Sequence, residues 1–119
     1  MGKPEWIREE GGYYDRDPRR FKLRVAVVYP GPYRAAVNSL GYQLVYYLAN
    51  SVEGVMAERF TSDSIASIDS GLEIGKFDVM LVSVHYEGQL HTLLEMLRRW
   101  GIHSRKEKRR IPIIAGGQG

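Results

Sequence analysis

The chain has 119 residues, of which 44% are hydrophobic and 26% are charged, and its formal net charge is +3 at pH 7. These values fit one globular domain with one hydrophobic core. Because the chain contains no cysteine, it forms no disulfide and offers no thiolate for catalysis or for a metal site. No stretch is apolar enough to span a membrane, and the first residues lack the apolar run of a secretory signal, which predicts a cytoplasmic protein.

Residues 1–23 are predicted to form a leader, because they show neither a helical nor a strand period. The domain itself is expected to span residues 24–119. The aromatic side chains of the leader are candidates for packing on the domain or on a neighbour, and they are Trp6, Tyr13 and Tyr14.

The domain opens with the β-branched run Val25–Tyr29, which is typical of a central strand buried on both faces. Apolar residues then recur every three or four positions from about residue 34 to 51, which predicts a helix. We expect the apolar face of this helix to pack on the sheet, with a glycine that permits close approach. That face consists of Val37, Leu40, Gly41, Leu44, Val45 and Leu48.

The pattern continues with further strands and a second helix. Val55–Phe60 predicts a strand nearer the sheet edge, because polar residues alternate in it. Residues 61–75 are ambiguous and allow at most a brief helix capped by Thr61, Ser62 or Asp63. Val79–Val84 predicts a strong strand, and Ile111–Ala115 predicts a fourth strand. Between these two strands, a helix that stops at Gly101 is predicted from the stripe Leu90, Leu93, Leu94 and Leu97.

Strands that alternate with helices predict an α/β fold with an open, doubly wound parallel sheet. Four strands are present, whereas such sheets normally have five or more. The fourth strand runs directly into the glycine-rich loop 115–119. We therefore expect the domain to be incomplete at its C-terminal end. The alternative is a short protein that recruits a partner to complete its sheet.

Ligands of open α/β sheets bind beyond the carboxyl ends of the strands, at the point where the strand order reverses. This rule selects the loops at residues 30–35, 83–88 and 116–119. Gly116 and Gly117 would let a flat ligand lie against the backbone, although they would equally suit a tight turn. The polar and aromatic rim of the predicted cleft consists of Tyr33, Ser83, His85, Tyr86, Glu87 and Gln118.

Several kinds of chemistry lack support in these loops. The chain has no GxGxxG or GxxxxGK[ST] phosphate motif, and no acidic residues where a phosphorelay receiver needs them. Its three histidines are too scattered for a metal set. Ser39 and Ser83 have no evident general base, which argues against a small hydrolase. We expect a binding site without catalytic or metal-ligating residues.

Positive charge is concentrated in residues 16–24 and 105–110. Basic runs of this kind attract the phosphates of nucleic acids, but beside strands they are more often solvated loops. A non-catalytic module that docks a protein or RNA through these basic loops is therefore the alternative function.

Five short segments occur in a characteristic order: SLG at 39–41, SIDSG at 67–71, FDV at 77–79, SVHYE at 83–87 and AGG at 115–117. In this respect the chain resembles the N-terminal domain of certain radical S-adenosylmethionine (SAM) enzymes. That domain is similar to the cobalamin-binding fold. The resemblance covers about residues 24–119 and implies a flavodoxin-like, cobalamin-binding-like domain.

The resemblance implies a domain that positions a cofactor or substrate for a downstream catalytic barrel, which would be its partner. SAM and a 4Fe–4S cluster would belong to that downstream part, because the family's CxxxCxxC is absent here. Cobalamin becomes the candidate ligand, with Ser83, Gly116 and Gly117 resembling the positions that line the pocket for its nucleotide tail. The expected cofactor-binding residues are Pro30, Tyr33, Ser83, His85, Tyr86, Gly116 and Gly117.

One departure from the cobalamin-binding pattern bears on the cobalt itself. Domains of that kind often carry DxHxxG after the first strand, and its histidine takes the lower cobalt position. Residues 30–36 of this chain contain neither aspartate nor histidine. Cobalt ligation by a histidine from this loop is therefore excluded.

Overall fold

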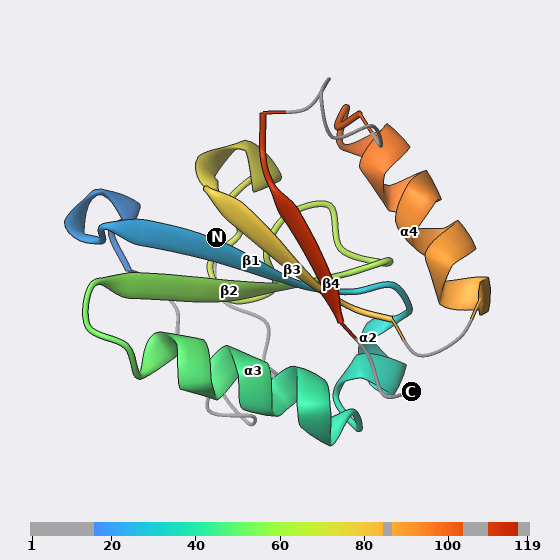
Figure 1. The fold of residues 1–119 in the computed structure, drawn as a ribbon, viewed down its shortest axis with the longest axis horizontal. Helices are drawn as coiled ribbons and strands as arrows, with labels where there is room; N and C mark the ends of the chain where they lie inside the picture. The colour runs from blue at the N-terminus through green and yellow to red at the C-terminus, as the bar shows by residue number, and fades with distance from the viewer. Residues whose placement is uncertain (1–15, 85–86, 104–109, 117–119) are drawn as a thin grey trace.

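The computed structural model describes residues 16–84, 87–103 and 110–116 (Figure 1). Within them, four parallel strands form one sheet in the order β2-β1-β3-β4. The strands are β1 (Leu23–Tyr29), β2 (Val55–Thr61), β3 (Val79–Ser83) and β4 (Ile113–Gly116). The helices are α2 (Tyr33–Ala36), α3 (Leu40–Asn50) and α4 (Glu87–Arg99), with 3₁₀ turns η1 (Pro18–Arg20) and η2 (Ile74–Lys76). The predicted α/β class and open parallel sheet are confirmed.

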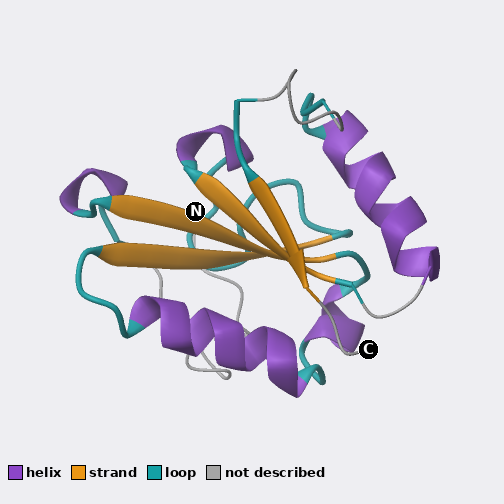
Figure 2. Ribbon diagram, in the orientation of Figure 1, coloured by secondary structure: helices purple, strands orange, loops and turns teal. Residues whose placement is uncertain are grey.

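Helices cover both faces of the sheet, as in a doubly wound fold (Figure 2). Val25 and Val27 of β1 pack with the α3 side, whereas Ala26 and Val28 pack with the α4 side. This alternation follows from the strand geometry, in which successive side chains point to opposite faces. The prediction that the first strand is buried on both faces is therefore confirmed. Within the described residues, no helix is both long and apolar enough to cross a membrane.

The helix predicted at about residues 34–51 is divided into α2 and α3. Ser39 causes the restart, because its hydroxyl accepts a 3.4 Å hydrogen bond from the Tyr42 amide at the first turn of α3. Residues 61–75 form turns followed by η2. The predicted stop at Gly101 is confirmed, since this glycine has a φ of 73°, which suits glycine at the end of a helix.

The predicted inward face of α3 is confirmed for Val45, which packs against the core, but is wrong for its leucines. Tyr42 and Tyr46 are the buried residues of this helix, while the leucines point to solvent. The Tyr42 hydroxyl donates to the carbonyl oxygens of Val27 and Phe60 at 3.2 and 3.0 Å, so the buried ring carries no unpaired polar atom. Gly41 is exposed and does not bring the helix close to the sheet. The exposed residues are Leu40, Leu44 and Leu48.

The apolar stripe predicted for helix α4 is confirmed in part. Leu93 and Leu97 face the core as expected, together with Met96. Leu90 and Leu94, however, are exposed. Only one stripe of this helix faces the sheet. Leu90 and Leu94 lie at the margin of that stripe and therefore remain in solvent.

Strand β2 lies at the edge of the sheet, as predicted, but its polar residues are buried. Side chains and loop backbone satisfy the outward backbone groups of this edge. The amide of Ala57 donates to Asn50 at 3.0 Å, and its carbonyl accepts from Asn50 and Arg16. The amide of Thr61 donates to the Ser64 hydroxyl at 3.0 Å. Another strand cannot pair with an edge that is covered in this way.

The middle of the same edge is covered by a buried ion pair. The guanidinium Nη2 of Arg59 lies 2.6 Å from Oδ1 of Asp69, and both side chains are fully buried. Asp69 also accepts from the Arg59 amide at 2.8 Å and from the Tyr46 hydroxyl at 2.9 Å. Gln43 accepts from Nη1 of Arg59, and the guanidinium stacks 4.1 Å from the Tyr46 ring centroid. The pair is thus hydrogen-bonded on all sides, as a buried charge requires.

Glu58 is the other buried charged residue of β2 and faces the opposite side of the sheet from Arg59. Its Oε1 accepts hydrogen bonds from the hydroxyls of Ser67 and Ser70 at 2.6 and 2.5 Å. Arg16 lies 3.5 Å from its Oε2. Burial raises the pKa of Glu58 above its ordinary value, and the two serine hydroxyls oppose that rise. The SIDSG segment therefore serves the two buried charges of β2.

Replacing Asp69 with alanine should lower the free energy of unfolding by about 3–5 kcal/mol, because the buried Arg59 would lose its counter-charge. Urea unfolding followed by circular dichroism measures the change. Asp17→Ala is the control, since Asp17 pairs with Arg19 on the surface and should change stability far less. Equal effects of the two substitutions would contradict the role given to the buried pair.

Glu58 should make stability depend on pH in a defined direction. Above about pH 4.5, the ordinary glutamate value, the unfolded chain releases this proton while the folded chain retains it up to the raised pKa. The folded state then binds more protons, so the free energy of unfolding falls as pH rises through this window. Glu58→Gln cannot ionise and should lack that fall. Urea unfolding of both proteins at about pH 4 and about pH 7 measures the slope, and parallel slopes would contradict the assignment.

Candidate functional site

The strand order reverses between β1 and β3. The chain leaves β1 towards β2 on one side and leaves β3 towards β4 on the other, so the two connections diverge (Figure 1). The gap between such connections, at the carboxyl ends of the strands, is where open α/β sheets bind ligands. Pro30 and Ser83 lie at these ends, as the sequence predicted.

The loop after β1 is held to the loop after β2. The carbonyl oxygen of Gly31 accepts from the Ser62 amide at 2.8 Å. The Asp63 carboxylate accepts from the Tyr33 amide at 3.1 Å and from the Thr61 hydroxyl at 2.6 Å. Asp63 therefore caps the start of α2, where Pro32 offers no side-chain cap. Tyr33, the first residue of α2, therefore has a backbone held in a defined position.

Gly31 is required by the packing of the same loop. A Cβ at this position would lie 2.7 Å from Cε1 of Tyr29, which is closer than real Cβ contacts. The ring of Tyr29 would have to move, and it packs edge to face on Tyr42 with a centroid separation of 5.4 Å. Any larger residue at position 31 would therefore require the Tyr29 ring to shift.

Ser83 and Gly116 are brought together at the other side of the candidate site. They are paired residues of the neighbouring strands β3 and β4, and the Val84 amide donates to the Gly116 carbonyl at 2.9 Å. A Cβ built on Gly116 meets no atom within 4 Å among the described residues. Within the same part of the chain, no hydrogen bond of the Ser83 hydroxyl is found. An open backbone surface with an adjacent hydroxyl group is therefore present.

Not every predicted site residue can be placed. His85, Tyr86, Gly117 and Gln118 lie outside the described residues. The structure thus brings together Ser83 and Gly116 on one side and fixes Pro30 and Tyr33 on the other. Among the described residues, no cluster of three or more histidine, cysteine or acidic side chains could hold a metal ion.

One contributor to this edge and two exposed apolar side chains were not predicted from the sequence. Asp63 was considered only as a cap for a brief helix that follows it, whereas it caps α2, thirty residues earlier. Leu40 and Ile65 were not recognised as surface residues, yet their exposed fractions are 81% and 87%. The leucine and isoleucine carried no sequence signal, because their exposure depends on the tertiary fold.

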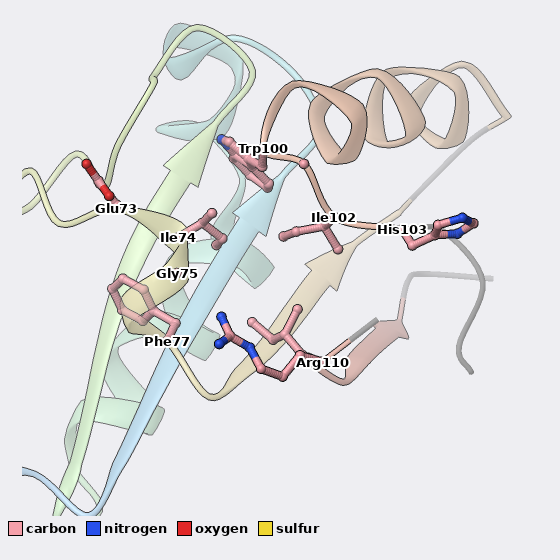
Figure 3. Close-up of a pocket in the computed structure, with 10 residues that line it drawn as sticks. Glu73, Ile74, Gly75, Phe77, Trp100, Ile102, His103 and Arg110 are labelled. Carbon is pink, nitrogen blue, oxygen red and sulfur yellow. The ribbon is translucent and has the colours of Figure 1, made fainter. Parts of the chain in front are cut away.

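A pocket of about 510 Å³ lies at the opposite end of the sheet, between η2, the end of α4 and the start of β4 (Figure 3). Its floor is apolar and includes Phe77, Trp100 and Ile111. Glu73 and His103 point away from one another at its rim (Figure 3). The Arg110 side chain turns toward the cavity, but Glu73 and His103 do not converge with it (Figure 3). Binding pockets combine an apolar lining with several convergent polar groups, and the described residues of this pocket lack such a set. The carboxyl edge remains the better candidate.

These features define a doubly wound α/β domain of the kind that takes a ligand or a partner at its switch point. A family model described as "Radical SAM proteins, N-terminal" matches residues 41–119, which is well over half of the chain. The chain therefore belongs to the radical SAM family and represents an N-terminal domain of it. No curated protein and no solved structure matches the chain.

Family membership implies SAM and a 4Fe–4S cluster in the catalytic part of such an enzyme. The cluster of these enzymes is held by cysteine thiolates. Because the 119 residues contain no cysteine, they supply none of those ligands.

Replacing Asp63 with alanine should loosen the loop after β1, because the Tyr33 amide would lose its carboxylate acceptor. The expected cost is about 1 kcal/mol, as for other helix caps. Hydrogen exchange by NMR should show faster exchange of the Tyr33 amide in Asp63→Ala. Asp63→Asn keeps an acceptor oxygen and should preserve protection. Equal exchange rates in both variants and the wild type would refute the capping role.

Proposed function

We propose that this domain positions a cofactor or substrate at its carboxyl edge for the catalytic part of a radical SAM iron–sulfur enzyme. The observation that carries the proposal is the open backbone at Gly116 beside the Ser83 hydroxyl, at the edge where the fold places ligands. None of the 119 residues is assigned a catalytic step.

Cobalamin is the ligand that we propose for this edge. Ser83 and Gly116, with Gly117 beyond the described residues, would hold its nucleotide tail, because a hydroxyl donor and a bare backbone suit a large flat group. Cobalamin supplies radical chemistry at its cobalt centre when it is bound. The loop 30–36 offers no histidine, so the lower face of the cobalt receives no imidazole from it. Tyr33 on that loop would border the ligand instead.

The downstream catalytic domain is the partner that we propose. The open edge of β4 supports a sheet that can be extended on this side. The carbonyls of Pro112 and Gly116 accept hydrogen bonds from β3, so Ile113 and Ala115 direct their backbone groups outward. Among the described residues, no side chain covers this edge, in contrast to β2. An apolar edge of this kind is suited to pairing with another strand.

The alternative function, docking of RNA through basic loops, rests mainly on residues 105–109, which lie outside the described part of the chain. Arg110 is described and is exposed. RNA binding through phosphates would weaken steeply with added salt. It would also disappear when the basic side chains of residues 105–110 are neutralised.

Titration with hydroxocobalamin should change its absorbance spectrum when the chain binds it. Gly116→Val should abolish the change, because the added side chain occupies the open backbone surface. Gly75→Val is the matched control, since the space at Gly75 is equally open but lies at the opposite end of the sheet. Ser83→Ala should weaken binding by about 1 kcal/mol, the usual worth of one hydrogen bond.

Two results would overturn the cobalamin proposal. One is a folded chain, judged by circular dichroism, that leaves the absorbance spectrum unchanged. The other is equal loss of binding in Gly116→Val and Gly75→Val, which would place the ligand away from the carboxyl edge. Salt-sensitive RNA binding by a chain that does not bind cobalamin would favour the alternative function.

A further inference from the structure

Helix α3 presents an uncharged apolar surface to the outside of the domain. None of its eleven residues, Leu40–Asn50, is charged. Side chains four residues apart lie above one another on a helix and in the turn that follows it. The exposed stripe consists of Leu40, Leu44, Leu48 and Val52, with exposed fractions of 81%, 52%, 56% and 55%.

Helix α4 shows what a solvent-facing surface of this domain looks like. Its exposed leucines, Leu90 and Leu94, alternate with His91 and Glu95, which lie 3.4 Å apart. Surface helices normally carry polar and charged residues on their outer face, and α4 follows this pattern. The outer face of α3 does not, which marks it as a contact surface.

The chain enters the domain beside one end of this surface. Arg16 is the first described residue, and its Nη1 donates to Oδ1 of Asn50, the last residue of α3, at 2.6 Å. Its Nη2 donates to the Ala57 carbonyl of β2 at 2.8 Å. Arg16, to which residues 1–15 are joined, is therefore held at the C-terminal end of α3.

The tethered segment is long enough to cover the stripe. From Leu40 to Val52 the stripe extends about 18 Å. Fifteen residues span about 22 Å as a helix and about 50 Å when fully extended. The segment also carries the apolar and aromatic side chains that such a surface needs, which are Trp6, Ile7, Tyr13 and Tyr14.

We propose that residues 1–15 dock on the outer face of α3 and cover its apolar stripe. The tether at Arg16 keeps the segment at high effective concentration beside this surface, so docking requires no additional partner. This inference is independent of the ligand at the carboxyl edge, because it concerns the opposite terminus and a different surface.

Tryptophan fluorescence tests the proposal, because the chain has two tryptophans, Trp6 and Trp100. In a Trp100→Phe protein, Trp6 is the sole reporter. The substitution removes an indole Nε1 that makes no hydrogen bond in the structure and keeps an aromatic ring beside Phe60. We expect emission of Trp6 to be blue-shifted and protected from acrylamide, relative to the urea-unfolded chain.

Charges placed on the stripe should release the segment. In the Trp100→Phe background, Leu44→Glu and Leu48→Glu should shift Trp6 emission to the red, towards the value of the unfolded chain, and remove protection from acrylamide. Leu94→Glu on α4 is the matched control, with a similar exposed fraction of 45%, and should leave both readouts unchanged. Circular dichroism verifies that each variant is folded.

The outcomes separate the possible occupants. Trp6 emission that already equals the unfolded value in the parent protein would overturn the proposal. So would emission that is protected but indifferent to both charges on α3. Sedimentation that shows a dimer, dissociated by Leu48→Glu, would assign the stripe to a second copy of the chain and would also overturn docking of residues 1–15.

Discussion

The buried ion pair between Arg59 and Asp69 is the interaction on which the arrangement of this domain depends. It fastens the connection between β2 and β3 to the outer edge of β2, where the Ile68 amide also donates to the Arg59 carbonyl at 2.8 Å. Two ions buried together are stable only when their remaining polar atoms are bonded, and Tyr46 and Gln43 meet that need. Because α3 supplies both of these side chains, the same pair also orients the helix. Tyr42 and Tyr46 turn inward and the leucines turn outward in the orientation that satisfies this buried charge.

This constraint gives the two edges of the sheet different properties. The β2 edge is covered by Asn50, Asp69 and Ser64, and it is closed to further strands. The β4 edge presents apolar residues and outward backbone groups without such cover in the described part of the chain. Among the described residues, the β4 edge is therefore the one with which another strand can pair.

The candidate site combines predictable and unpredictable elements. Pro30, Tyr33, Ser83 and Gly116 were assigned from strand ends, because a buried β-branched run followed by proline or glycine indicates where a strand stops. Asp63 escaped prediction in its actual role, since a carboxylate that caps a helix thirty residues earlier leaves no local pattern. The two glycines near the candidate site also differ in the space around them. Gly31 is required by contact with Tyr29, whereas Gly116 is under no such demand among the described residues, and this leaves its surface open.

The sequence by itself determined the α/β class, the central position of Val25–Tyr29, the edge position of the second strand and the places where the strands end. These features follow from hydrophobic period and strand termination, which are local properties of the chain. Only the tertiary structure decided which face of α3 is buried. The leucine period favoured one face, but burial of Arg59 and Asp69 required the hydroxyl and amide groups of the other. A helix buries the face whose polar groups can bond to the residues it packs against. For α3 those residues are on β2 and in the segment around Asp69, which are distant in sequence.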